Sequence, residues 1–536
     1  MANLRRGAHS LVFIAVVVVL CGASSANGRR FFDDDPLARE PESQDASKVE
    51  DWDIELLTDL AINLFTPVPA DAGSVRARNV NTIDEVPDSS WFTNRILARP
   101  LSLEQAAQGP LTSQGPAAGR WTVIAPKRAG AAPGFTMRDA AGELWFVSFD
   151  SNGYPEAASA AILVANKIFW TLGYFQVENH LVSVRRDQVE VAGSAKFTPL
   201  SGRTRPMRSH DLDEVFARSH RSPDGTYRGV AARGLPGRVV GGFRFAGTRP
   251  DDPNDVVPHE HRRELRALKV FGAWTNLVDM KAGNTLDTVI TDGGRGIVRH
   301  YLQDVGSTFG TGATGFREYD EGWEYLVELD LIRKRLLRFG YPLLPWVDAR
   351  YADNHAIGRF EGDAFDPPAW KPRVPTRALM YARYDDNFWA ARRVAAFSDD
   401  MIRAIVKTAA YSNSADERLL ADVLMQRRDK IARHYLNATN PLVDFALSAD
   451  GQLTFRNAAV DAGVGLEPSD GYAITWASFD NNTGASTPVV DSAAAGGPYL
   501  RARVAARGSV PERWAVPIEV YFRRTEGGWH LVGVER

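Results

Sequence analysis

The side chains best suited to chemistry lie in two short segments of this chain. Asp279 is followed by Lys281 and Asn284, and a later segment ends in Asp304-Val-Gly306. A carboxylate can orient an attacking hydroxyl, carboxylate and amide oxygens can hold Mg²⁺ on phosphates, and a cation can neutralise a transferring phosphoryl group. The order therefore predicts phosphoryl-transfer chemistry, with Asp279 as the base, Asn284 and Asp304 as metal ligands, and Lys281 as a local cation.

A hairpin between the two segments would bring these side chains together. The β-branched runs 288–290 and 297–298 flank Asp292-Gly-Gly-Arg-Gly296, which is a strong turn signal. Such a hairpin returns Asp304 towards Asn284. The Asp-x-Lys-x-x-Asn segment, the hairpin and the Asp-Val-Gly segment in this order are more specific than Asp-x-Lys-x-x-Asn alone. That motif by itself arises by chance in unrelated chains. The alternative is a solvated loop followed by an ordinary Asp-Val-Gly turn.

Earlier in the chain, the pattern predicts strands over 121–124, 135–137 and 144–149, with a glycine-containing loop at 127–134. A helix is predicted from Ala157 to about Leu172, because its apolar residues recur at helical spacing and Gly173 follows it. Strand, glycine loop and strand is an arrangement that can cover nucleotide phosphates.

A site that covers nucleotide phosphates needs a cation beside them and a carboxylate that holds this cation in place. The third strand offers Ser148 where it could supply the cation, and the helix interior holds no glutamate. Lys127 or Arg138, in or beside the glycine loop, could supply the missing cation. Glu156 could pair with it, although an acidic residue at a helix start also suits the helix dipole. If no other cation takes this role, the interaction of the site with nucleotide is impaired.

The stretch Asp304-Val-Gly306-Ser-Thr-Phe-Gly310 resembles the metal-binding end of phosphatidylinositol kinases and related atypical kinases, with Val305 and Phe309 departing from the Asp-Phe-Gly-x-x-Leu-Gly pattern. The resemblance is strongest over 259–310, moderate over 121–180 and absent over the last hundred residues. It implies an α+β, two-lobed protein-kinase-like fold with Mg²⁺ and ATP as cofactors. The linked motifs also resemble an uncharacterised family of exported bacterial proteins. The resemblance gives no substrate.

Length and composition predict two or three globular domains, since the chain has 536 residues, of which 44% are hydrophobic. The net charge of −3 leaves no electrostatic footprint for nucleic acid. Short strands between Gly, Asn and Asp clusters after about Asn440 predict a small β-sandwich. The expected divisions are a signal peptide (1–26), a flexible linker (27–50), an N-terminal extension (51–120), a kinase-like N-lobe with insertions (121–250), a helical C-lobe (251–438) and a small all-β domain (439–536).

The N-terminus predicts export to the periplasm or the medium. Two arginines precede an apolar run that ends at Cys21, and small residues follow up to Ala26. The run is too short for a membrane anchor, so cleavage after Ala26 predicts a mature chain without a transmembrane anchor. Cys21 is the single cysteine and allows a lipoprotein, although Leu20 before it argues against that processing. Cleavage after Ala26 removes this cysteine and with it disulfides and thiolate chemistry.

Three functions remain open from the sequence. The first is an extracytoplasmic phosphotransferase that uses Mg-nucleotide and transfers phosphate to a protein, lipid or small-molecule hydroxyl. The second is a pseudokinase, favoured by the missing lysine and glutamate. The third is a non-catalytic cell-envelope protein in which the β domain binds and the remainder is a scaffold. A hydrolase is least favoured, because Gly-x-Ser-x-Gly and His-Glu-x-x-His are absent from the sequence. The sequence does not indicate the oligomeric state.

Overall fold

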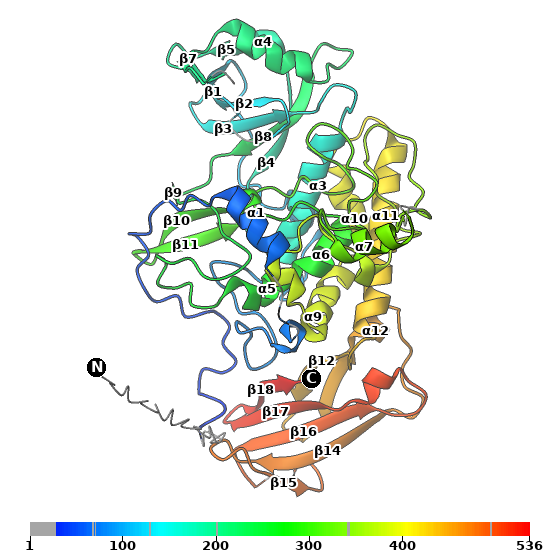
Figure 1. Ribbon diagram of the computed structural model, residues 1–536. Helices are drawn as coiled ribbons and strands as arrows, with labels where there is room; N and C mark the ends of the chain where they lie inside the picture. Colours follow the sequence, from blue (N-terminus) through cyan, green and yellow to red (C-terminus); the bar gives the residue numbers. More distant parts are fainter. Residues whose placement is uncertain are drawn as a thin grey trace, which may run out of the picture.

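The computed structural model describes residues 28–536, apart from 67, 68, 70, 128, 129, 200, 201, 340–343, 494 and 495. The expected signal peptide, including Cys21, lies outside these residues. The chain has mixed α+β structure, with a six-stranded sheet at one end, helices in the middle and a five-stranded sheet at the other end (Figure 1). Among the described residues, no helix combines the length and the apolar character needed to cross a bilayer.

The six-stranded sheet has the order β4-β8-β3-β2-β1-β5. Its strands are β1 (Trp121–Pro126), β2 (Gly134–Arg138), β3 (Leu144–Phe149), β4 (Asn179–Val184), β5 (Val189–Val191) and β8 (Tyr227–Arg233). The short strands β6 (Lys196–Phe197) and β7 (Arg205–Pro206) form a separate pair near helix α4 (Ser209–Arg218). The three strands predicted around the glycine loop are confirmed, and β1, β2 and β3 pair in antiparallel order.

Helix α3 (Ala157–Leu172) connects the six-stranded sheet to the helical region (Figure 1). Its start is fixed by Asp150, whose buried carboxylate accepts hydrogen bonds from the Ser159 backbone N–H at 2.7 Å and from the Ser159 hydroxyl at 2.7 Å. Such a carboxylate satisfies backbone donors that a helix N-terminus leaves unpaired. The helix ends at Gly173, where φ is 130°, so the predicted helix is confirmed.

The helical region contains α5 (Arg263–Arg266), α6 (Leu268–Thr275), α7 (Leu329–Leu337), α8 (Arg377–Met380), α9 (Tyr384–Ala395), α10 (Asp399–Lys407) and α11 (Ser414–Leu436). Its core includes Trp274 of α6, which is fully buried and donates through Nε1 to the Leu424 carbonyl of α11 at 2.9 Å. Buried ion pairs also tie its helices together, since Arg263 and Arg266 both reach Asp386 of α9 at 3.0 Å.

The N-terminal part of the chain packs against the other regions. Helices α1 (Leu56–Phe65) and α2 (Leu103–Gln108) lie in the extension, and Trp91 and Phe92 of the same stretch are buried in the main core. Residues 28–50, expected to form a flexible linker, are also anchored. Phe31 is 2% exposed among aromatic rings of the C-terminal region. Val49 is buried beside the hairpin formed by β10 (Leu286–Asp292) and β11 (Arg295–Tyr301). The expectation fails because these few apolar side chains find partners that are distant in sequence.

The C-terminal region is built on a five-stranded antiparallel sheet of order β15-β14-β16-β17-β18, with the separate hairpin β12–β13 packed into the same core. The strands are β12 (Leu442–Leu447), β13 (Leu453–Asn457), β14 (Tyr472–Phe479), β15 (Ser486–Val489), β16 (Tyr499–Ala506), β17 (Ile518–Thr525) and β18 (Gly528–Glu535), and the short helix α12 (Ala458–Asp461) follows β13. The structure that packs on the five-stranded sheet, where a β-sandwich would have its second sheet, is thus the single hairpin β12–β13.

Candidate active site

The segment that carries Asp279 packs on the helical core. Helix α6 ends at Asn276, which adopts a left-handed conformation with φ 54° and turns the chain out of the helix. Val278 and Met280 are buried on either side of Asp279, whose side chain is 21% exposed. Alternation of buried and exposed side chains in this extended segment therefore directs the Asp279 carboxylate away from the core.

The predicted hairpin is confirmed and joins the two halves of the site. Strands β10 (Leu286–Asp292) and β11 (Arg295–Tyr301) pair from Leu286 opposite Tyr301 to Asp292 opposite Arg295. The short strand β9 (Arg238–Val239) pairs with the outer edge of β10. The turn is closed by Gly293 and Gly294, which both have positive φ, a conformation that favours glycine.

Three of the predicted residues converge at the open end of this hairpin. The Asn284 side-chain amide donates to the Asp279 carbonyl oxygen at 2.6 Å, and the Asp304 backbone N–H donates to the Asn284 carbonyl oxygen at 3.0 Å. One oxygen of the Asp304 carboxylate accepts the Gly306 N–H at 3.0 Å. Because these contacts leave the Asn284 side-chain oxygen and the second Asp304 oxygen without a hydrogen bond inside the described structure, both remain open to an added ligand.

The Asp279 carboxylate lies between two cations. Lys281 Nζ is 2.9 Å from Asp279 Oδ2, and Arg317 approaches the same oxygen at 3.9 Å. Arg317 also donates to the Ser307 hydroxyl and so links Asp279 to the segment after Asp304. Lys281 was expected from the sequence, but Arg317 was missed because it lies in an irregular stretch with no motif around it.

A cation from the glycine loop reaches the third strand. Lys127 Nζ donates to the Ser148 hydroxyl at 2.9 Å. The Lys127 ammonium therefore lies directly beside the third-strand position at which the sequence has serine. Burial lowers the pKa of Lys127, and the nearby Asp304 carboxylate opposes that shift. The six-stranded sheet therefore directs one ammonium towards the residues brought together by the hairpin.

The two other residues considered for this role have different surroundings. Arg138 lies at the opposite end of β2 from the loop, and its guanidinium donates to the Gly142 carbonyl oxygen at 2.7 Å. Glu156 accepts the Ser412 backbone N–H at 3.1 and 3.0 Å and lies 3.8 Å from Arg228. It braces the start of α3 against the α10–α11 connection and forms no ion pair with Lys127 in the described structure.

Helix α3 and helix α1 enclose the site from two sides. A Cβ at Gly306 would meet the Ile162 side chain of α3 at 2.8 Å, so the Asp304–Gly306 turn packs directly on that helix. From α1, Leu56 lies 3.2 Å from the position of a Cβ at Gly283, within the short helix Ala282–Asn284. Burial raises the pKa of Asp59 on α1, and Arg244 and the Ala282 backbone N–H oppose that shift. The sequence of α1 carries no motif that predicts this contact.

The side-chain oxygens of Asn284 and Asp304 are the candidate ligands for a divalent cation. Within the described residues, no group of three or more His, Cys, Asp or Glu side chains is placed to hold a metal ion. One carboxylate and one amide oxygen nevertheless fit Mg²⁺, which commonly takes one or two protein ligands and completes its shell with water and substrate phosphates. Asn284 and Asp304 can therefore hold the ion together with a nucleotide, but form no complete protein cage.

Comparison with known proteins adds little to this geometry. No protein-family model matches the chain, and no curated protein matches it significantly. Among solved structures, a Golgi casein kinase aligns at 9% identity and a TM-score of 0.28, over 74% of this chain and 96% of that one. The same kinase with Mn/ADP bound aligns at 10% identity and a TM-score of 0.29, over 74% and 95%. Likeness at this level does not establish a shared fold.

Proposed function

We propose that this chain is an exported kinase-like protein that binds Mg-nucleotide where the six-stranded sheet meets the β10–β11 hairpin. Lys127 contacts the phosphates, Asn284 and Asp304 hold the metal ion, and α3 supports both groups. The observation that carries the proposal is the Lys127 ammonium, 2.9 Å from the Ser148 hydroxyl and coupled electrostatically to Asp304. Two segments more than 150 residues apart in the sequence thus contribute opposite charges to one place.

The arrangement also supports phosphoryl transfer to a hydroxyl. Asp279 is held by Lys281 and Arg317 and remains partly exposed, as a base that orients an incoming hydroxyl must be. The acceptor oxygen attacks the terminal phosphorus, the bond to the bridging oxygen of the nucleotide breaks, and the hydroxyl proton passes to Asp279. When bound, Mg²⁺ neutralises charge on the phosphate oxygens. Lys281 and Arg317 stabilise the charge that develops beside Asp279. The acceptor is a protein, lipid or small molecule.

A pseudokinase is the second candidate, and one observation favours it. The helix that packs on the Asp304–Gly306 turn offers no carboxylate to Lys127, since Glu156 is engaged with Ser412 and Arg228. Lys127 donates to the Ser148 hydroxyl, but within the described structure it forms no ion pair with a carboxylate that would fix its orientation, and an ammonium is a point charge on a flexible stem. Such a site binds nucleotide without positioning it for transfer. A non-catalytic scaffold in which the β domain binds remains the third possibility.

Calorimetric titration of the chain lacking residues 1–26 with Mg-ATP separates binding from the scaffold role. The proposal predicts saturable, Mg²⁺-dependent binding that Asp304→Asn removes and that Arg138→Met, on the same sheet but outside the site, leaves intact. Transfer of labelled γ-phosphate to a panel of protein, lipid and small-molecule acceptors then separates the phosphotransferase from the pseudokinase. Absence of any nucleotide binding by the folded chain would refute both.

A further inference from the structure

Helix α7 exposes an unusual amount of apolar surface. None of its nine residues is buried, although five of them are leucine or isoleucine. Large exposed apolar side chains on and beside this helix are Leu326, Leu329, Ile332, Leu336, Leu337, Phe339, Leu344 and Val347. A short helix gains little stability from its own hydrogen bonds and depends on packing. Because exposed apolar patches mark interaction sites, we looked for a partner that covers α7.

The apolar side chains of α7 form a stripe that faces away from the protein. Leu329, Ile332 and Leu336 follow one another at spacings of three and four residues, which places them on one side of the helix. Their exposed fractions are 72%, 44% and 73%. Phe339, just past the end of the helix, is fully exposed as well. Leu331 lies on another side of the helix and is partly covered by the protein.

Cations border this stripe. The segment 329–339 has a formal charge of +3, in a chain whose net charge is −3. Its charged residues are Asp330, Arg333, Lys334, Arg335 and Arg338. Within the described residues, Lys334 and Arg338 form no ion pair, and the Arg333–Asp330 pair at 3.6 Å joins two exposed side chains. Exposed ion pairs are weak, so these cations are available to an external anion.

Ion pairs attach α7 to the rest of the fold. Arg335 Nη2 lies 2.6 Å from an oxygen of the buried Glu324 carboxylate. Glu328, at the start of the helix, receives the Lys371 ammonium at 2.7 Å. These contacts leave the apolar stripe facing outward and hold the helix in one orientation.

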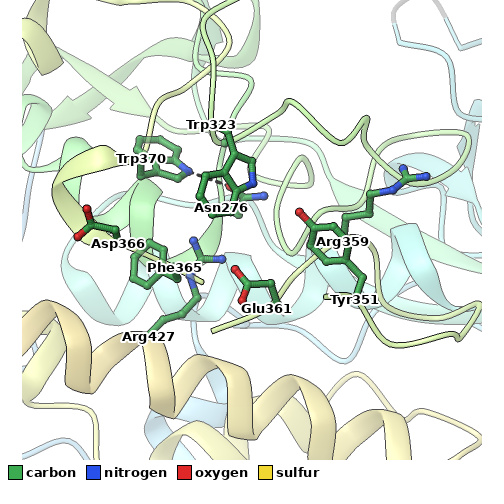
Figure 2. Close-up of a pocket in the computed structure, with 10 residues that line it drawn as sticks. Asn276, Trp323, Tyr351, Arg359, Glu361, Phe365, Asp366, Trp370 and Arg427 are labelled. Carbon is green, nitrogen blue, oxygen red and sulfur yellow. Dashed lines mark hydrogen bonds between the residues drawn. The ribbon is translucent and has the colours of Figure 1, made fainter. Parts of the chain in front are cut away.

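The stretch that leads into α7 also packs on the helical region. Trp323 lies near Trp370 and Asn276 around a small hollow (Figure 2), and the Trp370 indole donates to Asn276 Oδ1 at 2.8 Å. The hollow has room for about one water. Closer to the helix, the Leu326 backbone N–H donates to the Arg373 carbonyl oxygen at 2.7 Å. A surface that binds α7 therefore holds the whole helical region.

An anionic lipid bilayer fits this combination of side chains. Helices that lie in the plane of a bilayer place apolar side chains at the boundary of the acyl chains and cations at the lipid phosphates. A second copy of the chain fits less well, because a two-fold interface would bring two positive segments together. Cations near a helix C-terminus also suit the helix dipole. The dipole, however, does not account for leucines that are left in water.

We propose that α7 attaches this protein to the surface of an anionic lipid bilayer. Leu329, Ile332 and Leu336 insert below the headgroups, and Lys334 and Arg338 contact lipid phosphates. The attachment is peripheral, since no helix in the described part of the chain is long and apolar enough to cross a bilayer. The inference is independent of nucleotide binding.

Flotation with lipid vesicles tests the proposal on the chain without residues 1–26, because the apolar run at the N-terminus could bind lipid by itself. The vesicles contain phosphatidylcholine alone or equal parts of phosphatidylcholine and phosphatidylglycerol. We expect binding to the mixed vesicles, much weaker binding to phosphatidylcholine alone, and release from the mixed vesicles as salt is added, because salt screens the attraction between charges.

Substitutions on α7 separate the apolar and the charged contributions. Leu336→Ser should lower the partition coefficient about tenfold, since a leucine side chain leaves the apolar boundary. Lys334→Gln combined with Arg338→Gln should lower it about 30-fold, which corresponds to roughly 1 kcal/mol per cation. The matched controls lie in the C-terminal region and should bind as the parent does. They are Leu466→Ser, at a leucine that is 86% exposed, and Arg507→Gln combined with Arg513→Gln, at two exposed arginines.

Four results would overturn the assignment. One is that the folded chain binds neither kind of vesicle. Another is that the α7 variants, shown by circular dichroism to be folded, bind the mixed vesicles as tightly as the parent. The third is a parent dimer in sedimentation equilibrium that Leu336→Ser converts to a monomer, which would make α7 a self-interface. The fourth is binding of polyglutamate that depends on Lys334 and Arg338 while vesicles stay unbound, which would indicate an acidic protein partner.

Discussion

Replacing Lys127 with methionine should weaken Mg-ATP binding strongly. Methionine keeps much of the length and apolar bulk of the lysine stem but cannot donate to Ser148 or to a phosphate. Hydrogen bonds to charged groups contribute about 1.5–3 kcal/mol, so the dissociation constant should rise about 10- to 100-fold. Isothermal titration at constant Mg²⁺ measures this change, and Arg138→Met serves as the matched control because Arg138 is bonded to its own turn.

Moving the cation to the third strand gives a sharper test. Ser148→Lys alone should not strengthen binding, because two ammonium groups would then compete for one place beside Asp304. The double variant Lys127→Met with Ser148→Lys should regain part of the lost affinity, since one cation is again present. Ser148→Ala should cost only a few-fold, because it removes one hydrogen bond of roughly 1 kcal/mol.

The pH dependence of Mg-ATP affinity distinguishes a Lys127 ammonium that contacts the phosphates from a Lys127 side chain that only supports the structure. Burial lowers the pKa of Lys127 in the free protein, so the ammonium is lost on raising the pH before an exposed lysine would titrate. Above that lowered pKa, nucleotide binding must bring a proton with it, and affinity should fall as the pH rises. Lys127→Met should lack this fall. Unchanged Mg-ATP affinity in Lys127→Met, or tighter binding in Ser148→Lys alone, would refute the placement of Lys127 at the phosphates.

Other substitutions test separate parts of the account. Asp279→Asn should leave Mg-ATP affinity within a few-fold of the parent while removing any γ-phosphate transfer, as measured with labelled nucleotide; lost binding would contradict its assignment as the base. Phe31→Ala should lower the free energy of unfolding by about 3–5 kcal/mol in guanidinium titrations, whereas Phe32→Ala, 55% exposed, should have little effect; equal effects would contradict the anchoring of residues 28–50.

The strands, the helix after them and the hairpin were predictable because each carries a local signal. A run of apolar and aromatic residues marks β3, Gly173 ends α3, and Gly293-Gly294 sets the turn of β10–β11. A hairpin with fixed register also fixes where its ends lie, so the proximity of Asn284 and Asp304 followed from the sequence.

The contacts that complete the site were not predictable, since they join segments far apart in the chain. Nothing near Arg317 indicates that it faces Asp279, and nothing in α1 indicates its contact with Gly283. The choice between Lys127 and Arg138 depended on which end of β2 faces the hairpin, a fact set by packing of the sheet on α3. Likewise, the anchoring of Phe31 needed partners about 450 residues later, such as Phe479.

A crystal structure of the chain with Mn²⁺ and ADP tests the central claim most directly. The account predicts an anomalous manganese peak bounded by Asn284 and Asp304, with the diphosphate within hydrogen-bond distance of Lys127 Nζ. Nucleotide bound elsewhere on the protein, or a metal ion that contacts neither Asn284 nor Asp304, would contradict it.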